Sequence, residues 1–272
     1  MINEILAIFT HSFMLRALII GTLISLSSSL IGSTLVLKRN STIGDGLSHV
    51  AFGAFAVATV LNLSPLEFSL PIVIIVSIFL LKLNEYSKIH GDSAIALIAT
   101  SALALGTFVI SIKSGVNTDI NSYLFGSILS IGNKELIATI ILTVFVIILF
   151  ICSYNKIFAL TFDERYAKSI GIKTGFYNTI IAIICSIVVV LGMRLVGSLL
   201  ISSLIVFPTL SAMQVSNKFK SVVIYSVIIS TLAFILGLVL SYFLNTPTGS
   251  TVVLVNLGLF VLLKTASLIK KD

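Results

Sequence analysis

The sequence predicts an all-α, polytopic transmembrane helix bundle of about nine spans. Hydrophobic residues make up 57% of the 272 residues and charged residues only 10%, whereas a soluble domain carries about 25% charged residues. The apolar residues fall in stretches of about 20, the length that a helix needs to cross ~30 Å of hydrocarbon. The few charges lie in the short breaks between these stretches. A bilayer is therefore the expected solvent for most of the chain.

The apolar stretches give the number of spans. They lie at residues 14–37, 44–62, 66–83, 92–112, 135–153, 176–195, 197–215, 220–243 and 250–266. Only a glycine-containing break near residue 197 separates the sixth from the seventh, so eight spans is the alternative. Residues 1–272 are expected to form a single transmembrane domain.

Positive charge predicts the orientation, because Lys and Arg collect on the cytoplasmic side of membrane proteins. If the polar loop at 154–175 is cytoplasmic, thirteen basic residues lie inside and four lie outside. The N-terminus is then outside and the C-terminus inside. The inner set is Lys38, Arg39, Lys82, Lys88, Lys156, Arg165, Lys168, Lys173, Lys218, Lys220, Lys264, Lys270 and Lys271.

Two segments depart from the simple pattern of spans. Residues 117–132 are too polar to span the bilayer and too apolar for an ordinary loop, which favours a re-entrant or interfacial helix. The loop at 154–175 contains Asp163, Glu164 and Ala167, with Gly171 four residues further on. This order predicts a short helix stopped by the glycine, against the alternative of a solvated connector.

The stretch "IGDGLSHV", residues 43–50, places Asp45 and His49 four residues apart at the start of the second span. At this spacing the two side chains share one face of a helix. Ionisable groups inside a membrane are costly and face a cavity or a partner. Imidazole suits zinc, and carboxylate suits zinc or manganese. The pair is therefore a candidate metal site, and the alternative is a helix-start acid with a hydrogen-bonded histidine. Two side chains cannot complete a metal shell, so another helix or a second copy of the chain must contribute.

A second acid–imidazole pair, His90 and Asp92, precedes the fourth span. Asp92 is equally well explained as a helix N-cap, so both are carried as candidate secondary contacts. The sequence contains no GxxxxGK[ST] phosphate loop and no HExxH motif. We therefore expect no enzymatic activity in this chain.

Six stretches, in this order, resemble the membrane permease subunits of the zinc/manganese/iron ABC importers. They are "LVLKRNSTIGDGLSHVAFGAFAV", "GDSAIALIATSALALG", "DINSYLFGSIL", "FDERYAKSIGI", "MRLVGSLLISSLIVFPTLSA" and "NTPTGSTVVLV". The resemblance extends from about Arg16 to Leu263.

The resemblance implies a multi-pass permease of the bacterial inner membrane that acts as a homodimer or pseudo-dimer. Its expected partners are two cytoplasmic ATP-binding subunits, which hydrolyse the ATP, and an extracytoplasmic metal-binding protein. Residues 162–171 are similar to the family's coupling helix, with Asp163, Glu164, Ala167 and Gly171 carrying the match. The resemblance also implies that Asp45 and His49 belong to the polar region that lines or gates the metal path in this family.

The expected cargo is a divalent transition-metal ion, and no permanently bound cofactor is expected. One imidazole and one carboxylate fit zinc as well as manganese, and zinc is preferred because histidine is the better zinc ligand. Manganese or iron is the alternative ion. An ATP-independent secondary transporter and a membrane scaffold are the alternative classes; the near absence of ionisable groups in the middle of the spans argues against the former.

Overall fold

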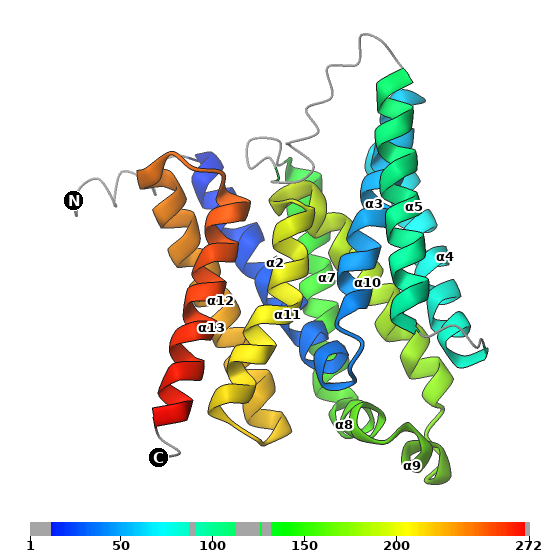
Figure 1. Ribbon diagram of the computed structural model, residues 1–272, viewed down its shortest axis with the longest axis vertical. Coiled ribbons are helices and arrows are strands. Elements are labelled where there is room, and N and C mark those ends of the chain that lie inside the picture. The colour runs from blue at the N-terminus through cyan, green and yellow to red at the C-terminus, as the bar shows by residue number, and fades with distance from the viewer. Residues whose placement is uncertain (1–11, 87–90, 113–125, 127–131, 270–272) are drawn as a thin grey trace.

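The computed structural model describes residues 12–86, 91–112, 126 and 132–269, and every regular element in this part of the chain is a helix (Figure 1). The predicted all-α fold is thus confirmed. Within these residues a long helix lies at each of the nine predicted spans. They are α2 (Ser12–Leu37), α3 (Thr42–Val60), α4 (Pro65–Tyr86), α5 (Gly91–Ile112), α7 (Asn133–Cys152), α10 (Thr174–Val196), α11 (Ser198–Val215), α12 (Phe219–Leu244) and α13 (Thr248–Ile269).

Eight of these helices are long and apolar enough to cross a membrane, and α4 adds a shorter apolar stretch, Pro65–Leu81. The sixth and seventh predicted spans are separate helices that meet at Gly197. This residue has φ +91°, a backbone conformation that favours glycine. The glycine therefore allows α11 to turn back directly after α10. The alternative prediction, in which the sixth and seventh stretches form one span, is wrong.

Two short helices, α8 (Tyr154–Phe162) and α9 (Glu164–Ser169), lie between α7 and α10. They lie at the end of the bundle where the C-terminus of α13 is found, and α9 stands off from the other helices (Figure 1). We call this the α9 end, and the opposite end, where α10 meets α11, the far end. The charge bias predicts that the α9 end is cytoplasmic, and this orientation stays a prediction.

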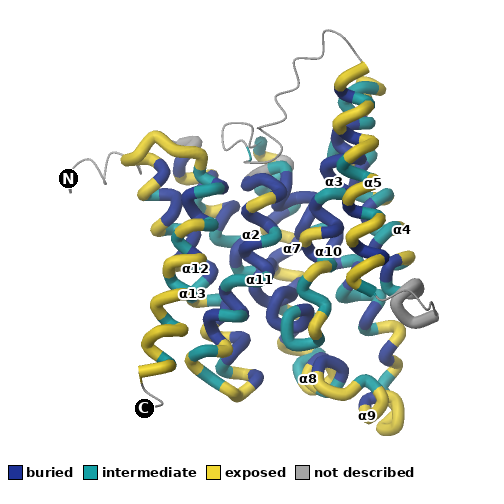
Figure 2. The backbone as a smooth tube through the Cα atoms, in the orientation of Figure 1, coloured by how far each residue is buried: buried dark blue, intermediate teal, exposed yellow. Residues whose placement is uncertain are grey.

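Buried residues concentrate on the central helices, and exposed residues on α5 and α13 (Figure 2). Small residues on α2 let neighbouring helices approach it closely. A side chain at Gly32 would overlap the backbone of Ile205 on α11. The hydroxyl of Ser230 on α12 donates a hydrogen bond to the carbonyl of Ser25 at 3.0 Å. Hence α2 contacts both α11 and α12 at backbone distance.

Glycines also allow α3 to pack closely on α5. A Cβ atom at Gly53 would lie 2.5 Å from the carbonyl oxygen of Ala102, and one at Gly46 would overlap Ile95. Gly106 of α5 lies against Gly53 in turn. The two backbones therefore touch, and α3 also packs against α4, α10 and α11.

The segment predicted to be re-entrant, 117–132, lies outside the described residues except for Gly126 and Gly132. Gly126 has φ +79°. A Cβ atom there would overlap the backbone where α10 ends at Val196. Glycine at this position thus permits contact with the α10–α11 turn at the far end.

Replacing Gly53 with alanine should lower stability, because the added methyl group must push apart two helix backbones. Overpacking of this kind costs about 1–3 kcal/mol. Gly258→Ala is the matched control, since Gly258 lies within α13 and has nothing within 4 Å of an added Cβ atom. There the better helix propensity of alanine should leave stability equal or higher. Thermal unfolding of the two variants in detergent measures the difference, and equal midpoints would contradict the close α3–α5 contact.

Candidate functional site

Asp45 and His49 lie one helical turn apart near the start of α3, and their side chains approach each other. The Nε2 atom of His49 is 3.7 Å from Oδ2 of Asp45. The Asp45 side chain is 61% exposed and that of His49 31% exposed. The predicted shared face is therefore present. It is reached from the surface of a single chain.

A third group comes from α11. The hydroxyl of Ser202 lies 3.0 Å from Oδ1 of Asp45 and donates to it. The same hydroxyl is 3.4 Å from that of Ser48, one turn along α3. Ser202 is not predicted from the sequence. Its only sequence signal is a pair of serines inside the apolar stretch "LLISSLIVF". The three side chains form what we call the α3–α11 site: Asp45, His49 and Ser202.

The α3–α11 site lies within the length of the bundle. Ser202 is four residues from the start of α11 at the far end, which corresponds to about 6 Å along the helix axis. The other end of α11, Val215, is about 20 Å further towards the α9 end by the same rise per residue. Asp45, which accepts a hydrogen bond from Ser202, therefore lies between the two ends of α11.

One ring nitrogen of His49 has no partner within the described part of the chain. Nδ1 is buried and makes no hydrogen bond there, while Nε2 faces Asp45. A buried polar atom without a partner costs free energy. This imidazole therefore has unused capacity for a proton donor, an acceptor or a metal ion.

The described residues of one chain do not form a complete metal shell. The described residues include no group of three or more His, Cys, Asp or Glu side chains that could hold a metal ion. Asp45 and His49 supply one oxygen and one nitrogen donor, and Ser202 orients the carboxylate. A tetrahedral zinc site needs about four donors.

Asp92 lies in the first turn of α5. Its Oδ1 accepts a hydrogen bond of 2.7 Å from the hydroxyl of Thr42, the first residue of α3. This bond fastens the start of α5 to α3 one turn away from Asp45. His90, the other candidate secondary contact, lies outside the described residues.

The loop at 154–175 contains the predicted short helix, α9. Asp163 caps its N-terminus by accepting a 2.9 Å hydrogen bond from the backbone N–H of Tyr166. Gly171 follows its C-terminus with φ +83°, a conformation that only glycine adopts without strain. Ala167 is fully buried, whereas Tyr166 and Ile170 are more than half exposed. Exposed apolar side chains on a capped, projecting helix are typical of a surface that contacts another protein.

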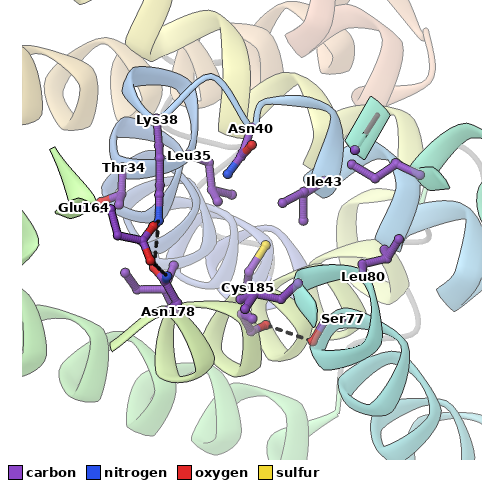
Figure 3. A pocket seen from close by; sticks show the side chains of 15 residues that line it. Thr34, Leu35, Lys38, Asn40, Ile43, Ser77, Leu80, Glu164, Asn178 and Cys185 are labelled. Carbon is purple, nitrogen blue, oxygen red and sulfur yellow. Dashed lines mark hydrogen bonds and ion pairs between the residues drawn. The ribbon is translucent and has the colours of Figure 1, made fainter. Parts of the chain in front are cut away.

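Three side chains connect α9 to the bundle, and we call them the α9 clamp: Lys38 at the end of α2, Glu164 in α9 and Asn178 in α10. The Lys38 ammonium is 2.9 Å from Glu164 Oε2 and 2.8 Å from Asn178 Oδ1. The Asn178 amide donates to Glu164 Oε1 at 3.1 Å, which closes the triangle. Figure 3 shows the three side chains converging at the edge of a cavity of about 240 Å³.

Opposing effects set the pKa of Glu164. Partial burial raises it, but the hydrogen bond and charge of Lys38, the Asn178 amide and the charge of Lys168 together outweigh burial. The pKa of Glu164 therefore lies below its ordinary value of 4.5. Lys168 is 3.7 Å from Glu164 and 62% exposed, so Lys38, which is only 21% exposed, is the stronger partner.

Comparisons with known proteins point to one family. Residues 10–267 match the model of the ABC 3 transport family. The chain is 30% identical to the high-affinity zinc uptake system membrane protein ZnuB of Buchnera aphidicola, over 86% of this chain and 90% of the relative. It is 26% identical to the manganese transport system membrane protein MntC of Listeria monocytogenes, over 90% and 87%. It also resembles the solved structure of PsaBC from Streptococcus pneumoniae in complex with Fab, with a TM-score of 0.86, 27% identity and full coverage of both chains.

The α9 clamp should weaken at acidic pH. Because the pKa of Glu164 is lower in the folded than in the unfolded chain, its stabilising contribution is fully present above the unfolded value and is lost as the pH falls through the lowered value. Thermal unfolding of the wild type and of Glu164→Gln, measured from pH 7 down to pH 3, tests this. The wild type should be the more stable at pH 7, and the difference should shrink towards the acidic end. A constant difference across this range would contradict a charged clamp.

Proposed function

Because the chain belongs to the ABC 3 transport family, we propose that it is the membrane permease of an ATP-driven importer of a divalent transition-metal ion. The observation that carries the proposal is the α3–α11 site. A carboxylate that is 61% exposed lies beside an imidazole inside the length of the bundle. A charged group at that depth cannot face lipid without a large cost. It must therefore face water or another chain, as the side chains of an ion path do.

We propose zinc as the cargo, on the coordination chemistry of His49. Relatives named for zinc uptake and for manganese transport are similarly distant from this chain. Imidazole is a good ligand of zinc, whereas manganese prefers oxygen donors. Manganese and iron are the alternatives, and the uptake experiment below distinguishes them.

A second copy of the chain is the proposed source of the missing donors. If a two-fold axis passes beside α3, the two copies together offer two carboxylates and two imidazoles, enough for a four-coordinate ion. The exposure of Asp45 on a single chain is what such a shared site requires. The site must also release the ion, since conduction needs binding that is favourable enough to enter and weak enough to leave.

ATP hydrolysis is assigned to a separate cytoplasmic subunit, and capture of the ion to an extracytoplasmic metal-binding protein. In this proposal α9 docks on the ATP-binding subunit through its exposed side chains, including Tyr166 and Ile170. α9 is capped by Asp163 and ends before Gly171. It is joined to Lys38 through Glu164 and packs through the buried Ala167.

The α9 clamp provides a route from α9 to the metal path. Glu164 holds Lys38, and only six residues lie between Lys38 and Asp45. The turn between α2 and α3 is fixed by backbone hydrogen bonds, among them one of 2.8 Å from the N–H of Asn40 to the carbonyl of Leu35. A displacement of α9 would therefore pull on the end of α2 and, through this turn, on the start of α3.

Asp45→Ala and His49→Ala should each abolish most zinc uptake while leaving membrane assembly intact. Radioactive zinc uptake is measured in cells that carry the permease with its ATP-binding subunit and binding protein, at equal expression. Asp92→Asn is the matched control, because asparagine keeps an oxygen that can accept the hydrogen bond from Thr42. This variant should retain uptake within about twofold of the wild type, a smaller change than the loss of one neutral hydrogen bond would cause.

Competition and energy dependence complete the uptake experiment. Excess unlabelled zinc should block the labelled ion more strongly than manganese or iron, and the reverse order would assign a different cargo. Replacing the ATP-binding subunit with an inactive variant should stop uptake. Continued uptake with that variant would support an ATP-independent transporter. If Asp45→Ala and His49→Ala both take up zinc as the wild type does, Asp45 and His49 have structural roles only.

Lys38→Met should reduce uptake about tenfold with the metal donors unchanged, because a hydrogen bond to a charged group contributes about 1.5–3 kcal/mol. ATP hydrolysis by the assembled complex should persist, so that ATP consumed per ion rises. Lys168→Met is the control, since it removes a lysine that also pairs with Glu164 but is mostly exposed, and it should change this ratio little. An unchanged ratio in Lys38→Met would show that α9 acts on the bundle by another route.

A further inference from the structure

A groove outside the α3–α11 site opens on the lipid-facing side of the bundle near the α9 end. It has a volume of about 620 Å³ and lies between α7 and α12, with α8 closing one end. Leu30 of α2 lies at its floor and is 8% exposed. Ile147, Phe150 and Val223 line its walls. The groove is therefore apolar along most of its length.

The helix faces beside the groove have the composition of a surface in contact with lipid. Ile151 of α7 is 72% exposed and Ile224 of α12 is 47% exposed, and both line the groove. One turn further along each helix, Ile148 and Ile228 are exposed as well. Apolar surface of this extent in a multi-pass membrane protein faces hydrocarbon. The groove thus opens to the bilayer.

The end of the groove next to α8 is positively charged. Lys156 of α8 and Lys220 of α12 both line it, and both residues are exposed. No acidic side chain is among the residues that line it in the described part of the chain. Lys156 lies 5.4 Å from the ring centre of Tyr177, a contact that orients the ammonium group without neutralising it.

The N-termini of two helices meet at the same place. The rings of Tyr154, the first residue of α8, and Phe219, the first residue of α12, are 5.6 Å apart. Neither helix has a side-chain cap. The dipoles of the two helices add to the charge of the two lysines and favour an anion.

We propose that this groove binds a phospholipid with an anionic headgroup. The headgroup phosphate lies against Lys156 and Lys220, and an acyl chain follows the groove over Leu30 between α7 and α12. Basic pockets at the membrane surface that continue into apolar grooves between helices suit such lipids. A neutral phospholipid would fill the same groove without using the charge.

The chain contains no tryptophan, so a single introduced indole can report on the lipid beside it. Ile224→Trp places the indole in the groove, and Ile228→Trp places it one turn away on the same exposed face. Each full-length variant is reconstituted in vesicles of phosphatidylcholine and phosphatidylglycerol, with either lipid brominated. Bromine quenches a nearby indole, which gives the relative affinity of the two lipids at each position.

The relative affinity for phosphatidylglycerol should exceed that for phosphatidylcholine about 25-fold at the groove position, because each of the two lysines contributes about fivefold. The ratio should be near one at the Ile228→Trp position. Adding Lys156→Gln and Lys220→Gln to Ile224→Trp should remove the preference, whereas adding Lys264→Gln, a lysine of α13 that does not line the groove, should preserve it.

Several outcomes would overturn the proposal. An equal preference at both indole positions would mean a general surface effect, and a preference that survives loss of both lysines would mean that they do not hold the headgroup. Removal of the preference by inorganic phosphate would make this a site for free anions. If the brominated lipids quench the indole of Ile228→Trp and neither lipid quenches that of Ile224→Trp, protein covers the groove.

Discussion

The backbone contact of α3 with its neighbours is the constraint on which the proposed ion path depends. Gly53 and Gly46 let α3 lie against α5, and Gly44 lets it lie against Ile205 of α11. Only this close approach brings Ser202 within 3.0 Å of Asp45. In lipid, helices gain little from burying apolar side chains against each other, so small residues and interhelical hydrogen bonds decide where they pack. The residues that place the α3–α11 site are therefore different from the residues that would touch the ion.

The incompleteness of the α3–α11 site follows from the same packing. α3 is covered by α4, α5, α10 and α11, yet the Asp45 side chain remains 61% exposed and one nitrogen of His49 has no partner among the described residues. A site with four donors from one chain would hold zinc as structural sites do. Two donors and an orienting serine give weaker binding, which suits an ion that must move on.

The sequence predicted features that depend on local spacing and missed those that depend on distant contacts. The nine helices follow from the lengths of apolar stretches, the shared face of Asp45 and His49 from an i, i+4 spacing, and the end of α9 from the glycine at 171. Ser202 was missed because it lies 157 residues from Asp45. Lys38 was counted only as a topological charge, although it contacts Glu164, 126 residues away, and Asn178, 140 residues away. No periodicity in the sequence encodes such pairings.

The α9 clamp resolves a difficulty that a projecting helix poses for any coupling mechanism. A six-residue helix on a flexible loop would move without moving the bundle. Here Asp163 and Gly171 fix the two ends of α9, and Glu164 links it to α2 and α10 at once. The clamp is largely shielded, because the Lys38 side chain is only 21% exposed, so breaking it would leave a charge without its partner in a poorly solvated place. A force on α9 therefore moves the ends of α2 and α10 with it in preference to separating from them. Lys38 directly precedes the turn into α3. The movement is therefore transmitted first to α3, the helix that carries Asp45 and His49.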